Sequence, residues 1–390
     1  MIPGFTSTGS KRPEVMFGND PECPRTMVRA VGCSVWDSQG REYLDTSMAL
    51  GAVSLGYAHP AVTRAAKKAL EDGVVGPLAP ALEDEVAERL ASCVPGVESV
   101  RFFKTGAEAV AAAVRIARVA TGRDRILTCG YQGWLDVFSD ASGVPPEVRC
   151  LRREIRFNDV DQLESALTGG RGGGGDPVAA VVIEPVIDVA PAAEWVHALN
   201  DACRRSGALL VLDESKTGLR LGLGGAAARY GFAADLTVLG KALGNGLPIA
   251  AVGGSLAVMD AATRTWISST LATEFVGLAA AAAVLDVYER ENVASHLSAI
   301  GDRFFRGLER IAHEYPTVIE SRRGIPEFCY LQCNHEDASL RLGAGCSSRG
   351  LIFKRNAYNF VSLAHTEDVI DDVLQRVGEV VDMLSRRGDS

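Results

Sequence analysis

The 390-residue sequence lacks any apolar stretch that approaches the roughly 20 residues of a membrane-spanning helix. The nearest stretch, at residues 278–284, is short and rich in alanine. Residues 1–20 contain no apolar run of the kind that a secretory signal peptide requires. We therefore expect a cytoplasmic protein that does not enter a membrane.

Positive charge is also scarce, because 40 Lys and Arg stand against 49 Asp and Glu, a net charge of −9. Proteins that bind nucleic acid phosphates normally present a basic face, so we expect no nucleic-acid partner. The nine cysteines are an odd number, which fits a disulfide framework poorly, and the six histidines include no His-x-x-x-His pair. Cys329 and Cys333 would share one face of an apolar strand and are interpreted as core. We expect no metal site.

Apolar residues are abundant, at 47%, and their pattern alternates between helical and strand-like from about Gly51 onward. Such alternation is typical of an α/β domain with a mostly parallel sheet covered by helices. A helical period predicts helices at 59–72 and 83–94, and apolar runs predict strands at 100–103, 125–128, 178–183, 208–212, 236–239 and 249–252. Most of these runs are continuously apolar, as expected for strands buried on both faces.

The pattern changes after about residue 291. A long helix is predicted at 293–314, strands near 327–333 and 360–362, and a final helix at 367–386. A hairpin is predicted at 34–44. We therefore expect three segments: an N-terminal segment, 1–50, that packs with the small domain or at the interface, a large domain, 51–290, and a smaller α+β domain, 291–390.

Two features at predicted strand ends could bind a phosphate and a planar ring. Thr105 would cap a helix over 108–120, leaving backbone N–H groups and a positive dipole end for an anion, and Gly106 would let a phosphate approach closely. Tyr131 lies between Gly130 and Gly133, just after the strand at 125–128. Each feature taken alone is more often an ordinary capped helix or a turn.

Two further strand ends carry charge. Asp213 and Glu214 close the apolar strand at 208–212, where a carboxylate needs a cationic partner, although metal binding or helix capping is the alternative. Lys241 follows the strand at 236–239, between Gly240 and Gly244. It is either a surface lysine or a partly buried amine of the kind that forms a Schiff base.

The order and spacing of these four features are more informative than any one of them. A phosphate cradle, an aromatic ring, a strand-end aspartate and a lysine 28 residues later are the groups that pyridoxal 5′-phosphate requires. The alternative of a P-loop nucleotide site is disfavoured, because Ala242 and Asp235 stand where that motif needs Ser or Thr and glycine.

With these residues in place, nearly the whole chain resembles the class III aminotransferases of fold type I, and within them the branch of glutamate-1-semialdehyde 2,1-aminomutase. The matching motifs are Gly-Tyr-Ala-His-Pro at 56–60, Thr-Gly-Ala-Glu-Ala at 105–109, Glu-Pro-Val at 184–186, Leu-Asp-Glu at 212–214, Asp-Leu through Lys at 235–241 and Ser-Leu-Ala-His-Thr at 362–366. The resemblance implies a fold type I, pyridoxal-phosphate-dependent transferase with a mostly parallel sheet and a second, smaller domain.

The resemblance also implies residue roles. Lys241 would be the Schiff-base lysine and Asp213 the partner of the pyridine nitrogen. Thr105, Gly106 and Ala107 would bind the phosphate, Tyr131 would stack on the ring, and Ser215 would stand where the family usually has a valine against the ring. Thr270 aligns with a threonine that contacts the phosphate of the neighbouring subunit, which implies a homodimer with composite active sites.

Several departures concern the substrate. Gln132 replaces a frequent histidine, Val189 an asparagine and Ala357 a glutamate of the aminomutase, and Lys11, beside Arg12, replaces its substrate-binding arginine. The segment after Trp134, where the aminomutase has a long gating loop, is short. We therefore expect an aminotransferase that works on a small-molecule amino donor and a ketone or aldehyde acceptor by a ping-pong mechanism. An aminomutase and a catalytically silent binding protein are the alternatives.

Overall fold

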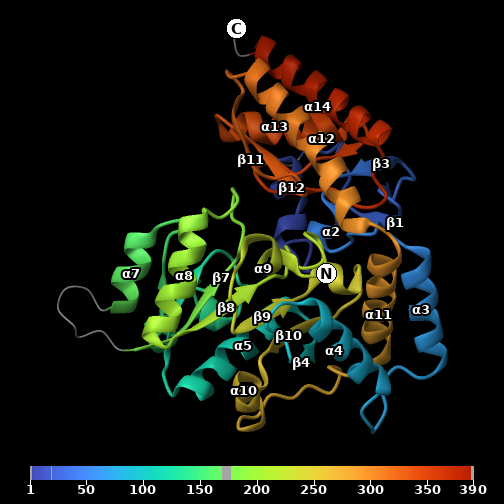
Figure 1. The fold of residues 1–390 in the computed structure, drawn as a ribbon. Helices are drawn as coiled ribbons and strands as arrows, with labels where there is room; N and C mark the ends of the chain where they lie inside the picture. Colours follow the sequence, from blue (N-terminus) through green and yellow to red (C-terminus); the bar gives the residue numbers. More distant parts are fainter. Residues whose placement is uncertain (1, 19, 169–176, 388–390) are drawn as a thin grey trace. The chain divides into compact units, whose positions relative to one another are not determined.

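The computed structural model describes residues 2–18, 20–168 and 177–387. The chain divides into two compact units, which are considered separately below. The first comprises Met1–Pro60 with Asn292–Ser390, and the second comprises Ala61–Glu291. Figure 1 labels their helices and strands. None of the described helices is long and apolar enough to cross a membrane.

A seven-stranded sheet forms the centre of the second unit in the described part of the chain, with strand order β4-β10-β9-β8-β7-β5-β6. The strands β5 to β9 are mutually parallel, and β10 runs antiparallel to both β4 and β9. The strands are β4 (Ser99–Phe103), β5 (Arg125–Cys129), β6 (Arg152–Glu154), β7 (Val178–Ile183), β8 (Leu209–Asp213), β9 (Leu236–Leu239) and β10 (Ala250–Gly254). The predicted α/β class with a mostly parallel sheet is confirmed.

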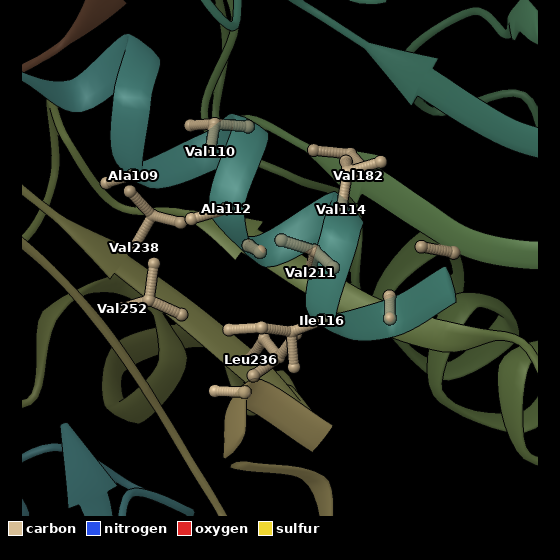
Figure 2. Packing of buried hydrophobic residues seen from close by; sticks show 14 of the residues in the cluster. Ala109, Val110, Ala112, Val114, Ile116, Val182, Val211, Leu236, Val238 and Val252 are labelled. Atoms are coloured by element: carbon tan, nitrogen blue, oxygen red, sulfur yellow. The ribbon is translucent and has the colours of Figure 1, made fainter. Parts of the chain in front are cut away.

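Helix α5 (Gly106–Thr121) packs across this sheet (Figure 2). Its buried face is rich in alanine, so the helix axis can approach the strands closely. Apolar side chains from four strands fill the space below it, namely Val182 of β7, Val211 of β8, Leu236 and Val238 of β9, and Val252 of β10. All six residues of β7 are buried, as the continuous apolar run predicts. This packing fixes the start of α5 relative to the ends of the strands.

The remaining elements of the second unit surround the sheet or connect its strands (Figure 1). They are α3 (Pro60–Glu71), α4 (Ala81–Cys93), η2 (Asp136–Phe138), α6 (Pro146–Arg149), α7 (Val160–Thr168), α8 (Ala193–Ser206), α9 (Gly225–Tyr230), η4 (Lys241–Gly244), α10 (Leu256–Met259), η5 (Asp260–Thr263) and α11 (Phe275–Arg290). The predicted helices at 59–72 and 83–94 correspond to α3 and α4.

Two smaller sheets and several helices make up the first unit as far as its residues are described. The sheets have the orders β1-β2-β3-β13 and β11-β12-β14. Their strands are β1 (Met27–Val31), β2 (Ser34–Asp37), β3 (Glu42–Asp45), β11 (Ile319–Ile325), β12 (Phe328–Cys333), β13 (Leu351–Ile352) and β14 (Asn359–Phe360). The helical segments are η1 (Gly9–Lys11), α1 (Pro13–Phe17), α2 (Met48–Gly51), α12 (Val293–Glu314), α13 (Glu336–Ser347) and α14 (Glu367–Arg387). The two long amphipathic helices agree with the predictions to within one residue.

Candidate active site

Four of the residues singled out in the second unit follow or end strands that run in the same direction. Because β10 is antiparallel to both β4 and β9, β4 points the same way as the parallel strands. Thr105 follows β4, Tyr131 follows β5, Asp213 ends β8 and Lys241 follows β9. Carboxyl ends of parallel strands meet at one edge of a sheet, which is where α/β proteins bind their ligands.

Close approaches at three glycines show that the loops touch one another at this edge. A Cβ added to Gly106 would lie 3.0 Å from the Ser215 hydroxyl oxygen, and one added to Gly240 would lie 3.6 Å from the same atom. A Cβ added to Gly133 would lie 2.8 Å from the Cβ of Ala107. The loops after β4, β5, β8 and β9 are therefore in contact. The Ser215 hydroxyl is buried at this contact.

The start of α5 is held by a reciprocal capping box. The Thr105 hydroxyl accepts a hydrogen bond from the Glu108 backbone N–H at 3.2 Å, and Glu108 Oε2 accepts one from the Thr105 backbone N–H at 3.0 Å. Thr105 is thus the predicted N-cap, and its side chain is engaged within the helix terminus. The N–H groups of Gly106 and Ala107 lie in the first turn, where no intrahelical acceptor exists, so they are available to an anion.

Asp213 is a buried carboxyl group, with 5% of its surface exposed. One oxygen accepts a hydrogen bond from the Ser215 backbone N–H at 3.0 Å. Burial raises its pKa to about 6, and the negative charge of Glu184 also raises it, whereas donation from Ser215 and the positive charge of Lys241 lower it. A carboxylate in this environment gains from a cation placed against it.

The neighbouring acid, Glu214, is engaged differently. Its carboxylate accepts hydrogen bonds from the Thr217 hydroxyl at 2.5 Å and from the backbone N–H groups of Ala226 and Ala227 at 2.9 and 2.7 Å. It therefore caps the start of α9, the structural role that the sequence left open for this pair of acids. Asp213, by contrast, lies at the end of the central strand β8 and does not cap a helix.

Lys241 has an unusual backbone. Its φ of 45° lies in the left-handed region, which costs a residue with a Cβ roughly 1 kcal/mol. Its side chain is open to solvent, yet protein surrounds it densely enough that desolvation lowers the pKa of the amine. The charge of Lys216 lowers this pKa further, whereas Glu184 and Asp213 raise it. Strain and a lowered lysine pKa at a strand end are both typical of functional sites.

A buried ion pair beside these residues was not predicted. Lys216 Nζ lies 2.9 Å from Glu184 Oε1, and their side chains are only 6% and 13% exposed. Glu184 Oε2 accepts a hydrogen bond from the Tyr131 backbone N–H at 2.7 Å. The available signal was a glutamate directly after one apolar strand and a lysine three residues after the end of the next strand along the chain.

The residues around Tyr131 divide into one exposed and one buried side chain. The Tyr131 ring is 71% exposed, whereas Gln132 is buried and its Nε2 donates to the Cys129 carbonyl at 2.6 Å. The Gln132 amide therefore stabilises the turn that presents Tyr131.

Thr270 lies exposed in the segment between η5 and α11. The start of α11 is tied to the residue before Thr105, because Lys104 Nζ contacts Glu274 Oε1 at 2.7 Å while Glu274 also caps α11. Trp266 and Leu271, which flank Thr270, are 84% and 52% exposed.

Lys11 and Arg12 belong to the first unit. Lys11 and Lys354 both line a cavity of about 610 Å³. Lys354 is 5% exposed and donates from Nζ to the Ser10 carbonyl at 2.5 Å, and burial lowers its pKa to about 8, with the charges of Arg355 and Lys11 acting in the same direction. The Arg12 guanidinium instead packs against Gly4.

Comparisons with known proteins cover almost the whole chain. Residues 17–137 and 150–381 match the family model of the class-III aminotransferases. A glutamate-1-semialdehyde 2,1-aminomutase from Neisseria gonorrhoeae is 31% identical, and the match covers 97% of this chain and 96% of that protein. The FumI protein of Sphingopyxis sp. MTA144, in its PLP internal aldimine form, has a TM-score of 0.90 at 24% identity and covers 98% and 94% of the two chains. An omega-transaminase from Sphaerobacter thermophilus has a TM-score of 0.83 at 24% identity, with 92% and 91% covered.

Proposed function

The chain belongs to the class III aminotransferases, whose cofactor is pyridoxal 5′-phosphate, and from this premise we propose that it transfers an amino group from an amino donor to a ketone or aldehyde acceptor. The observation that carries the proposal is the contact of the loops bearing Gly106, Ser215 and Gly240, which brings a helix N-terminus, a buried carboxyl group and a lysine to one edge of the sheet.

The residues present fit the cofactor. The N–H groups of Gly106 and Ala107 and the buried Ser215 hydroxyl are suited to its phosphate or ring oxygen, with Thr105 at the same terminus. Asp213 is suited to the protonated pyridine nitrogen, and the exposed ring of Tyr131 is suited to stack on the heterocycle. When bound, the cofactor supplies an electron sink for the carbon next to the substrate nitrogen.

Lys241 has two functions in this proposal. It would hold the cofactor at the aldehyde carbon, and when released its free amine would accept and return a proton at the substrate carbon. The lowered pKa of the amine favours both functions, because only the neutral form is nucleophilic and basic.

Two features favour an aminotransferase over an aminomutase. Val189 and Ala357 stand where the aminomutase has polar groups, and the family match is interrupted at residues 138–149, beside the shortened segment after Trp134. The 31% identity to an aminomutase over nearly the full chain favours the second candidate, an intramolecular amino transfer.

The first prediction separates these candidates. Incubated with a panel of amino acids and amines, the enzyme should convert its cofactor to the amino form and release one keto acid or aldehyde per site. Absorbance spectroscopy and mass spectrometry measure both products. Turnover of glutamate-1-semialdehyde with no second substrate would instead identify an aminomutase, and protein that stays colourless with added cofactor would identify a silent binding protein.

We further propose a homodimer in which Thr270 reaches the phosphate site of the partner subunit. The exposed side chains of Trp266 and Leu271 beside it support an interface, because burying large apolar side chains against a partner subunit is favourable. Sedimentation of the purified protein tests the assembly, and a monomer at micromolar concentration would contradict it.

A second prediction concerns the substrate. Lys11 lines the cavity of the first unit, and we propose that it contacts an acidic group of the donor or acceptor. Lys11→Met should raise KM for acidic substrates roughly 10-fold with little change in kcat, the typical effect of losing one charged hydrogen bond. Arg12→Met is the matched comparison, and an unchanged KM in the Lys11 variant together with a raised one in the Arg12 variant would reassign the contact.

A further inference from the structure

The loop after β8 carries a second lysine, Lys216, at the same distance along the chain from the last β8–β9 pair as Lys241. In the parallel pair of β8 and β9, Asp213 is paired with Val238, and each lysine lies three residues beyond its strand's member of this pair. The contact of Ser215 with Gly240 shows that the two loops remain adjacent past the strand ends. The topology therefore places both lysines in adjacent loops at the same edge of the sheet.

The Lys216 ammonium is held in place by Glu184. The 2.9 Å ion pair is almost completely buried, and the second carboxylate oxygen of Glu184 is occupied by the Tyr131 N–H at 2.7 Å. Gly130 makes this arrangement possible, since a Cβ there would lie 2.6 Å from Glu184 Oε2. Lys216 is thus a buried cation whose position is fixed from the loop after β5 as well as from β8.

Four charged groups act on the Lys241 amine. Lys216 and Arg220, in the segment between β8 and α9, are positive and oppose protonation, whereas Glu184 after β7 and Asp213 at the end of β8 are negative and favour it. An adjacent cation is a known means of keeping a nucleophilic lysine neutral.

We infer that Lys216 is a positioning residue for the proposed reaction: held by Glu184, its ammonium repels a proton from Lys241 Nζ and so keeps that amine neutral and reactive. Glu184 in turn couples this cation to the turn that presents Tyr131. The inference rests on the proposed role of Lys241. It does not require Lys216 to touch the substrate or the cofactor.

The test measures the protonation of Lys241 directly. In the full chain freed of cofactor, Lys241 is labelled by a trace amount of an amine-acylating reagent at different pH values, and mass spectrometry gives the rate for the peptide that contains it. Lys216→Met should raise the pH midpoint of labelling by about 1 pH unit, the usual effect of removing a nearby like charge. Lys216→Arg, which keeps the charge, should retain the wild-type midpoint.

Further variants protect the result against a folding defect. Lys216→Gln is neutral but can still donate to Glu184, so it should fold and raise the midpoint as Lys216→Met does. Glu184→Gln removes a negative charge and should lower the midpoint. Lys68→Met, at an exposed site on α3, is the matched control and should leave it unchanged. In the loaded enzyme, the acid limb of the kcat/KM profile should move in the same directions.

An unchanged midpoint in both neutral Lys216 variants would overturn the inference, and so would an equal change in Lys216→Arg, because packing rather than charge would then be responsible. These outcomes are independent of the proposed function. If Lys241 were not the attachment site, cofactor would be found on another peptide whatever the labelling midpoints.

Discussion

Replacing Lys241 with alanine is expected to lower kcat/KM by at least about 10⁴-fold, because the variant loses both the covalent attachment and the group that moves the proton. Borohydride reduction of the wild-type enzyme should place the cofactor on the peptide that contains residue 241, and the variant should carry no such label. Steady-state kinetics with the donor found in the panel gives the rate.

Stability measurements distinguish this loss from a folding defect. The left-handed φ of 45° at Lys241 suits glycine, so Lys241→Gly should be inactive yet more stable than the alanine variant by about 1 kcal/mol in urea unfolding. Lys68→Ala, on an exposed helical face, should keep full activity. Retention of a labelled lysine or of substantial turnover in both Lys241 variants would show that another amine carries the reaction.

Much of the second unit could be predicted because its signals are local. The continuous apolar runs identify β7, β8 and β9 as strands buried on both faces, and the alternation with helices predicts a parallel sheet. β13 could not be predicted, because two residues, Leu351 and Ile352, pair with β3 more than 300 positions earlier. Nothing in the local sequence specifies such a pairing.

The same distinction applies to the candidate site. The positions of Thr105, Asp213 and Lys241 at strand ends follow from local pattern. The engagement of Thr105 in a capping box with Glu108 is also local, since the two residues are three apart. By contrast, the ion pair of Lys216 with Glu184 depends on the order of the strands, which periodicity alone does not reveal.

The cavity of the first unit also depends on contacts between residues far apart in the sequence, which local patterns do not predict. The Lys354 ammonium donates to the Ser10 carbonyl, a contact between residues 344 positions apart. In the sequence, Lys354 and Arg355 are two adjacent basic residues with no feature that distinguishes them. Only the fold shows that Lys354 is buried against a cavity while Arg355 pairs with Glu336.

Asp213→Asn is expected to make the cofactor-free protein more stable at pH 8, although it removes a group of the proposed site. Burial raises the pKa of Asp213 to about 6 from an ordinary value of 3.8, so the folded state binds the extra proton between these values. The stabilising effect of the neutral acid is fully present below about pH 4 and is lost as pH rises through 6. The free energy of unfolding lost over this range is about 3 kcal/mol. The advantage of the Asn variant in urea unfolding should therefore be larger at pH 8 than at pH 5.

Bound cofactor should reverse this order. A protonated pyridine nitrogen would place a cation directly against the Asp213 carboxylate, so the cofactor should stabilise the wild type more than the Asn variant. Because a neutral amide cannot hold that proton on the ring, kcat should fall about 10²–10³-fold, the usual effect of removing one electrostatic contact to a developing charge.

For the same reason, cofactor uptake by the wild type should weaken below about pH 6, when Asp213 becomes protonated. Calorimetric titration with the cofactor at pH 5 and 8 measures this dependence, and an Asn variant that binds and reacts like the wild type would assign the pyridine nitrogen to another group.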